Sequence, residues 1–228
     1  PEVQCRRDAH ATVTAWEDAR IRMRSALGEG GDAVRAGAFA EQLDEYGSEW
    51  LRIRREACDT ARDQRHRDAA MRCLARGARA VESIVAVVAA APPDPAAPIR
   101  TLPLPPLDRC TLERATELSE PPLDPDKASA IDAVLADIEQ TNVLIWNGEP
   151  DAARTLAQST LHHANQLQHA PTLVTALLNA GDAELEAGRL ESSHGHYEQG
   201  FYLAQSLGFD EDAAQAASSL IEILNDLG

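Results

Sequence analysis

The sequence lacks the segments that would place it directly in or across a membrane. It has no run of eighteen uninterrupted apolar residues, and its longest apolar stretch, residues 80–91, is broken by Glu82. This excludes a membrane-spanning helix within the chain. Residues 1–7 also lack the basic stretch and apolar core of a signal peptide. We therefore expect a chain that is either cytosolic or cut from a longer precursor.

Catalytic motifs are also absent. The sequence contains no glycine-rich phosphate loop, kinase catalytic-loop motif, GxSxG elbow or HExxH pair, so we expect no enzyme activity and no cofactor in this chain. Five histidines fall in the second half and are interpreted as packed or solvated side chains: His162, His163, His169, His194 and His196. A transition-metal site, and with it a metal-dependent enzyme, is the alternative.

Basic residues are scarce in the second half of the chain. Residues 1–100 hold sixteen arginines against sixteen acidic residues, whereas residues 101–228 hold five basic residues against twenty-one acidic ones. The whole net charge of -16 therefore lies after residue 100. This predicts two units with different surfaces, and it argues against nucleic acid or an anionic membrane as the partner of the acidic unit.

The apolar residues that are present recur at helical spacing. The pattern predicts long helices over residues 2–26, 33–61 and 66–90, joined by short connections and packed as an antiparallel bundle. Residues 92–108 then hold seven of the thirteen prolines. We expect this segment to be extended and to run along the bundle to Cys110, which gives a first domain over residues 1–110.

A forty-residue spacing marks the second half. Gly148, Gly188 and Gly228 are forty residues apart, and each follows an apolar helical stretch. Residues 173–208 resemble a tetratricopeptide repeat at these positions: Leu177, Ala180, Gly181, Gly188, Ser193, Tyr197 and Gly200. Glu184 departs from that pattern, because an aromatic residue is usual there. The resemblance implies that residues 111–228 form an α-solenoid of about two and a half tetratricopeptide-like helix pairs, so the expected fold is all-α throughout.

A solenoid of this kind binds partners on its concave side, which the first helix of each pair lines. The residues that we expect to line this groove are Asn142, Ile145, Leu178, Asp182, Leu185 and Glu186. A mixed apolar and acidic lining suits a basic or amphipathic peptide of a partner protein. The alternative is that Leu178 and Leu185 pack only against neighbouring helices.

The pairing of the four cysteines indicates in which cellular compartment the protein folds. Cys58 and Cys73 lie equally far in sequence on either side of the Arg65–His66 pair, so an antiparallel hairpin would bring them level with each other. This predicts a Cys58–Cys73 disulfide and leaves Cys5 to pair with Cys110. Two disulfides imply an oxidising, extracytoplasmic compartment. Free cysteines in a cytosolic protein and a four-cysteine zinc site are the alternatives, and no CxxC spacing supports the latter.

The first unit has a family resemblance of its own. The segments LDEYGSEWLRIRREACDTARDQ (residues 43–64), AAMRCL (69–74) and LPLPPLDRC (102–110) are similar to the region that follows the membrane helix in large myxobacterial serine/threonine protein kinases. The marks of this resemblance are Tyr46, Trp50, Arg54, Ala57, Cys58, Thr60, Arg72, Cys73 and Leu74. The Arg65–His66 pair departs from the family's usual Gln-Ser turn.

This resemblance implies a function outside the membrane. The chain would be the helical extracytoplasmic sensor or scaffold region of a membrane-anchored kinase, tethered through a transmembrane helix outside this sequence. It would control the kinase by binding a protein or peptide, or by self-association. A stand-alone cytosolic tetratricopeptide adaptor with reduced cysteines is the second interpretation.

Overall fold

The computed structural model describes residues 2–29, 33–60, 64–90, 92–93, 96, 98–112 and 124–227. Within these ranges, the side chains of residues 2–13, 15, 29, 60, 65, 109, 125, 226 and 227 are not described. Across the described backbone the regular structure is helical, with no strand, which confirms the expected all-α class. The chain divides into two compact units, Pro1–Pro122 and Leu123–Gly228. None of the helices in the described ranges has the length and apolar character needed to cross a bilayer.

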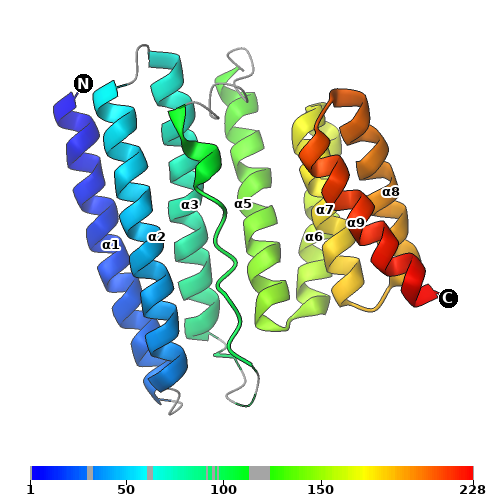
Figure 1. The fold of residues 1–228 in the computed structure, drawn as a ribbon, viewed down its shortest axis with the longest axis horizontal. Helices are drawn as coiled ribbons and strands as arrows, with labels where there is room; N and C mark the ends of the chain where they lie inside the picture. The colour runs from blue at the N-terminus through cyan, green and yellow to red at the C-terminus, as the bar shows by residue number, and fades with distance from the viewer. Residues whose placement is uncertain are drawn as a thin grey trace. The chain divides into compact units, whose positions relative to one another are not determined.

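Three long helices form the first unit: α1 (Glu2–Glu29), α2 (Ala33–Thr60) and α3 (Gln64–Ala90). They lie side by side as an antiparallel bundle (Figure 1), because each carries an apolar stripe that only its neighbours can cover. The largest fully buried side chains of this unit are Met23, Phe39, Trp50, Ile53, Leu74, Val81, Ile84, Val85 and Val88.

An aromatic cluster fixes the middle of the bundle. The Trp16 and Trp50 rings pack edge to face with centroids 5.2 Å apart, and the Trp50 indole Nε1 donates a hydrogen bond to the Leu74 carbonyl oxygen at 2.8 Å. Gly47 makes room for this cluster, since a Cβ there would lie 3.0 Å from Cε3 of Trp16. The cluster therefore ties all three helices together at one level.

The proline-rich segment is extended, as expected from its composition. Residues 98–106 carry no helix or strand and run back beside α3 (Figure 1), because proline has no amide hydrogen to donate to a helix. The side-chain Oε1 of Gln42 accepts a hydrogen bond from the Leu102 amide at 2.8 Å. Leu102 and Leu107 are buried. The segment thus packs on the bundle and ends at the short 3₁₀ helix η1 (Asp108–Cys110).

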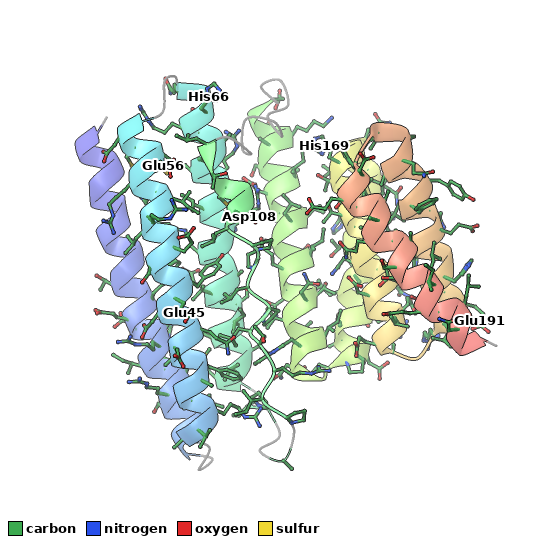
Figure 2. The ribbon with its side chains drawn as sticks, viewed as in Figure 1. Glu45, Glu56, His66, Asp108, His169 and Glu191 are labelled. Atoms are coloured by element: carbon green, nitrogen blue, oxygen red, sulfur yellow. A yellow bond between two sulfur atoms is a disulfide. The ribbon has the colours of Figure 1, made fainter. Side chains whose placement is uncertain are left out.

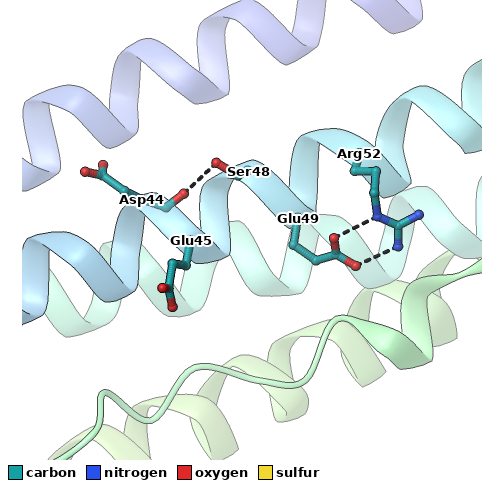
Figure 3. Close-up of a pocket in the computed structure, with 5 residues that line it drawn as sticks. All are labelled: Asp44, Glu45, Ser48, Glu49 and Arg52. Atoms are coloured by element: carbon teal, nitrogen blue, oxygen red, sulfur yellow. Dashed lines mark hydrogen bonds and ion pairs between the residues drawn. The ribbon is translucent and has the colours of Figure 1, made fainter.

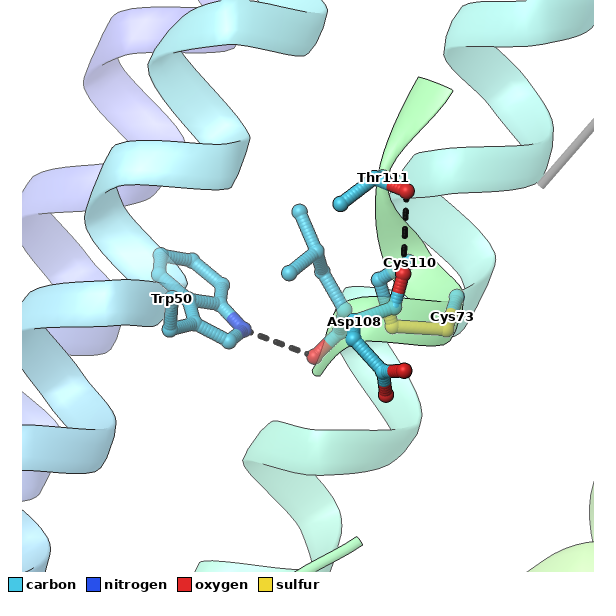
Figure 4. Close-up of a disulfide and its surroundings, with 6 residues drawn as sticks. Trp50, Cys73, Asp108, Cys110 and Thr111 are labelled. Atoms are coloured by element: carbon cyan, nitrogen blue, oxygen red, sulfur yellow. Dashed lines mark hydrogen bonds between the residues drawn. A yellow bond between two sulfur atoms is a disulfide. The ribbon is translucent and has the colours of Figure 1, made fainter. Parts of the chain in front are cut away.

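The disulfide pairing differs from the prediction. Cys73 on α3 is bonded to Cys110 in η1, with Cα atoms 5.3 Å apart (Figure 4), so the predicted Cys58–Cys73 and Cys5–Cys110 pairs are both wrong. Equal distance from a turn sets the height of two residues along a hairpin, but it does not set their rotation about each helix axis. Cys73 lies on the side of α3 that meets Leu107 and Cys110.

The structure describes the side chain of only one of the other two cysteines, Cys58. Cys58 is buried and also disulfide-bonded, with a partner other than Cys73. Cys5 lies in the part of α1 whose side chains are outside the description.

Five helices form the second unit: α5 (Pro125–Asn147), α6 (Pro150–Leu167), α7 (Ala170–Glu186), α8 (Leu190–Leu207) and α9 (Asp210–Leu227). Each packs on the next, and α7 also packs on α5 and α9. The buried faces of α6 and α8 recur at a spacing of forty: Ala153, Ala157, Thr160 and Ala164 in α6, and Ser193, Tyr197, Gly200 and Ala204 in α8.

The turns of the second unit repeat in the same way. Gly148 and Gly188 both adopt positive φ, at 82° and 71°. In both turns the glycine amide and the next amide donate to carbonyls three and five residues earlier, as in a Schellman motif. The glycine spacing read from the sequence therefore marks equivalent turns at Gly148 and Gly188, while Gly228 lies outside the described residues.

Candidate functional site

A hydrogen-bonded pair joins α7 to α8 at the centre of the second unit. The Tyr197 hydroxyl donates to Oδ1 of Asp182, and the tyrosine side chain is fully buried. The ring reaches this position because Gly181 leaves room for it, since a Cβ on Gly181 would lie 2.9 Å from Cε2 of Tyr197. From α9, Ser219 and Glu222 lie close enough to the Tyr197 hydroxyl to act on its pKa, which Ser219 lowers and Glu222 raises.

The Asp182 carboxyl is held in an unfavourable environment for a charge. Burial raises its pKa to about 6, the hydrogen bond from Tyr197 opposes this change, and the nearby Glu186 carboxylate raises it further. Burial and the Asp182 charge likewise raise the pKa of Tyr197 well above its ordinary value. Near neutral pH, Asp182 is therefore an anion that an incoming positive charge would stabilise.

A second polar pair joins α7 to α5. The Asn179 amide Nδ2 donates to Oδ1 of Asn142 at 2.7 Å, and Asn179 is 4% exposed. Oδ1 of Asn179 is buried without a hydrogen-bond partner. The pair therefore leaves one buried amide carbonyl oxygen, that of Asn179, without a hydrogen bond.

These polar residues stand at equivalent places in successive helices. Asn142, Asp182 and Glu222 are forty residues apart, and Asn179 and Ser219 are forty residues apart. We call the set Asn142, Asn179, Asp182, Glu186, Ser219 and Glu222 the polar face. It is contributed by α5, α7 and α9, and Glu186 and Glu222 are its exposed carboxylates.

The structure brings only part of the sequence-predicted groove to the surface. Asn142 and Asp182 belong to the polar face, and Glu186 is exposed beside them. Leu178 is 4% exposed and belongs to the core cluster with Tyr197, so it offers no surface to a ligand. Leu185 packs against the same cluster. Ile145 packs against the alanines between α6 and α7.

Sequence reasoning missed three members of the polar face: Asn179, Ser219 and Glu222. The sequence did carry a signal for Ser219 and Glu222, because they lie forty residues after Asn179 and Asp182. The Tyr197 hydroxyl gave no such signal, because the tyrosine reads as a core residue of the repeat pattern.

A second buried carboxylate lies at the junction of α6, α7 and α8. Glu184 is 3% exposed, and its Oε1 accepts a hydrogen bond from Nε2 of Gln158 at 2.8 Å. Arg189 Nε lies 3.9 Å from Oε2. Burial lowers the pKa of nearby His196, while the Glu184 charge opposes this. Glu184 therefore lies within a partly satisfied polar network.

The histidines do not converge on a metal site. His162 and His163 are exposed on α6 with ring centroids 6.0 Å apart, and His169 caps the start of α7, where Nδ1 accepts from the Thr172 amide at 3.4 Å (Figure 2). Among the residues whose side chains are described, no group of three His, Cys, Asp or Glu residues could hold a metal ion.

The first unit has a shallow depression along one face of α2 (Figure 3). Its lining comes from a single helix: Asp44, Glu45, Ser48, Glu49 and Arg52. Glu49 and Arg52 pair with each other at 2.6 Å, and both side chains are about half exposed. An exposed pair of this kind contributes little binding or stability, so we place the candidate site on the polar face of the second unit.

Chemically, the polar face presents carboxylate and amide groups, which can bind a cation or a hydrogen-bond donor. The Tyr197 hydroxyl, which lies buried beside the polar face, already donates its hydrogen bond to Asp182, and its raised pKa makes it a poor nucleophile. Comparison with family models, curated proteins and solved structures finds no match.

Proposed function

We propose that the second unit is a tetratricopeptide-like solenoid that binds a basic, extended segment of a protein or peptide across the polar face. One observation carries the proposal: Asp182 accepts a hydrogen bond from Tyr197, and two further carboxylates lie close to this pair, Glu186 near Asp182 and Glu222 near Tyr197. Residues 123–228 contain three basic and seventeen acidic side chains, so the surrounding field also attracts cations.

The binding step follows from the charges. A lysine or arginine of the ligand would pair with Glu186 and Glu222, which are exposed, and its charge would favour ionisation of Asp182. Because the pKa of Asp182 is raised to about 6, binding near this pH would release a proton. Affinity for a basic ligand should therefore rise as the pH increases from 5 to 7.

We further propose that the chain is the extracytoplasmic part of a membrane-anchored serine/threonine kinase of the myxobacterial type. The sequence resemblance of the first unit motivates this, and the disulfides at Cys73–Cys110 and Cys58 are compatible with an oxidising compartment. Ligand binding or self-association would shift the population of oligomers and so control the kinase.

A cytosolic adaptor with reduced cysteines is the competing function. A count of free thiols in the unreduced, denatured chain as isolated from its native host separates the two functions. Zero free thiols supports the extracytoplasmic receptor, and four free thiols supports the adaptor.

The polar face is tested with two labelled peptides of equal length, one rich in lysine and one rich in glutamate, followed by fluorescence anisotropy. We expect saturable binding of the lysine-rich peptide alone. Glu186→Lys with Glu222→Lys should weaken it at least about tenfold, since two carboxylate contacts are reversed. Glu191→Lys with Glu198→Lys, which makes the same charge change at two exposed sites on α8 (Figure 2 labels Glu191), is the matched control. Equal binding by the two double variants would reject this site.

A further inference from the structure

The last helix exposes large apolar side chains on one face. Ile221 is 62% exposed and Leu224 is 56% exposed, although both lie in the interior of α9. They are three residues apart and therefore share one side of the helix. Leu220, beside them, packs inward against the core of the second unit. The exposed pair is thus a separate face from the one that holds α9 in place.

The internal repeat shows what covers the equivalent face of an earlier helix in the unit. Forty residues earlier, the positions of Ile221 and Leu224 are taken by Gly181 and Glu184 on α7. Gly181 packs under the Tyr197 ring, and its carbonyl accepts a hydrogen bond from Ser193 Oγ at 2.8 Å. Glu184 is 3% exposed. In α7 this face is therefore buried: Gly181 lies against α8, the helix that follows it, and Glu184 lies where α6, α7 and α8 meet.

The same face is also buried in α5, the first helix of the first pair. Forty residues before Gly181 and Glu184 stand Thr141 and Leu144 on α5. Thr141 is fully buried, and Leu144 packs against the cluster that contains Ala153 and Ala157 of α6. The face is thus covered by a following helix in both α5 and α7. Ile221 and Leu224 occupy the same interface positions on α9. Within the described residues no following helix covers them.

The sizes of the side chains that face each other within a helix pair indicate which kind of helix could pack against Ile221. Gly181 faces the large Tyr197, whereas Thr141 stands in a pair whose second helix has Ala157 at the position of Tyr197. A larger residue on the first helix is thus matched by a smaller one on the second. Ile221 is larger than either Gly181 or Thr141, so its partner helix needs a small residue at this place, as in α6 and unlike α8.

We infer that Ile221 and Leu224 form a docking face for an amphipathic helix of a partner protein, one that carries alanine-sized residues with the spacing of Ala153, Ala157, Thr160 and Ala164. The helix would lie on α9 as α6 lies on α5, and it would bury both apolar side chains. The inference goes beyond the peptide-binding role proposed above, because it concerns another surface and needs no charge on the ligand.

The test uses the full chain and a labelled, end-capped peptide with the sequence of α6, residues 150–167. Fluorescence anisotropy should show saturable binding, and circular dichroism should show a gain of helix in the peptide. Ile221→Glu with Leu224→Glu should weaken binding at least about tenfold, because two apolar contacts are replaced by carboxylates in an apolar interface. Both sites are exposed, so the variant should keep the helical content of the parent chain.

Two controls make the outcome specific. Tyr202→Glu, at a tyrosine that is 62% exposed on α8, should leave the affinity unchanged. A peptide in which tryptophan replaces the alanine equivalent to Ala157 should not bind, because it removes the size match with Ile221. Absence of saturable binding, equal binding by the double variant, or binding of the tryptophan peptide would each overturn the inference. It would also be overturned if the double variant abolished a concentration-dependent dimer, because the face would then bind a second copy.

Discussion

Gln168 and Gly208 are forty residues apart and occupy the same left-handed backbone conformation at the ends of α6 and α8, with φ of 49° and 73°. Glycine adopts this conformation without steric strain, whereas a residue with a Cβ is destabilised there by about 1 kcal/mol or more. Gln168→Gly should therefore raise the free energy of unfolding of the second unit by about 0.5–1 kcal/mol. Urea unfolding followed by circular dichroism measures the change.

The reciprocal variant is the control for this prediction. Gly208→Gln should lower the free energy of unfolding by a similar amount, since nothing lies within 4 Å of a Cβ at Gly208 and only the backbone conformation opposes the change. A destabilised Gln168→Gly variant would show that the Gln168 side chain contributes more than its backbone strain removes.

The contact between Gly181 and the Tyr197 ring predicts the effect of adding one methyl group. A Cβ at Gly181 would lie 2.9 to 3.0 Å from three ring carbons of Tyr197. The ring is rigid and fully buried, so the clash should outweigh the roughly 0.5–1 kcal/mol that alanine gains over glycine within a helix. We expect Gly181→Ala to destabilise the second unit by about 1–3 kcal/mol.

Gly195 provides the matched control, because it also lies inside a helix but has nothing within 4 Å of its Cβ position. Gly195→Ala should stabilise α8 by about 0.5–1 kcal/mol. In a double-mutant cycle, Gly181→Ala should cost much less when Tyr197 is already replaced by alanine. Equal costs in both backgrounds would mean that the ring does not set the need for glycine.

Much of the helical framework was predictable because its sequence signals are local. The apolar spacing predicted helices over residues 33–61 and 66–90, and the structure has them at Ala33–Thr60 and Gln64–Ala90. The glycine spacing located the turns at Gly148 and Gly188. These signals depend on one helix or one turn at a time, so they need no knowledge of how the elements pack.

The pairing of Cys73 depended on information that local patterns lack. It required the path of residues 98–107, which brings Cys110 against α3. The same limit applies to the predicted groove, because Asp182 lies on the polar face whereas Leu178 is buried in the core. Both residues lie on α7, and only the packing of α8 against that helix decides that Leu178 faces the core. Rotation about a helix axis was the missing quantity in both cases.

Asp182 should make the stability of the second unit depend on pH. Its folded-state pKa of about 6 lies above the ordinary value of 3.8, so the folded state binds more protons between these two values. The free energy of unfolding should therefore rise as the pH falls from 7 to 4, and this stabilisation is lost as the pH increases through 6. The contribution is on the order of 1–3 kcal/mol.

Asp182→Asn isolates this effect, because asparagine stays neutral and can still accept a hydrogen bond from Tyr197. At pH 8 the variant should be the more stable chain, and the difference should shrink to near zero by pH 4. Subtracting the two stability curves removes the opposite contribution of His196, whose pKa is lowered. A difference that does not vary with pH would show that Asp182 does not titrate in this range.

The Cys73–Cys110 bond makes a prediction about both connectivity and stability. Trypsin cleaves after Arg72, Arg76, Arg109 and Arg114, so a non-reduced digest should contain the peptides CLAR and CTLER joined by a disulfide. Detection by mass spectrometry of CLAR joined instead to EACDTAR, the peptide of Cys58, would contradict the structure.

The bond also closes a loop with a sequence separation of 37 residues, for which the loop-entropy model gives about 3–4 kcal/mol as an upper figure. Replacing both Cys73 and Cys110 by serine should lower the free energy of unfolding of the first unit by up to this amount, without leaving an unpaired thiol. The parent chain treated with reductant should lose at least as much, since Cys58 is also disulfide-bonded. A smaller loss in the reduced parent than in the double serine variant would show that the serine substitutions perturb the packing around Trp50 and Leu107, which share a cluster with Cys110.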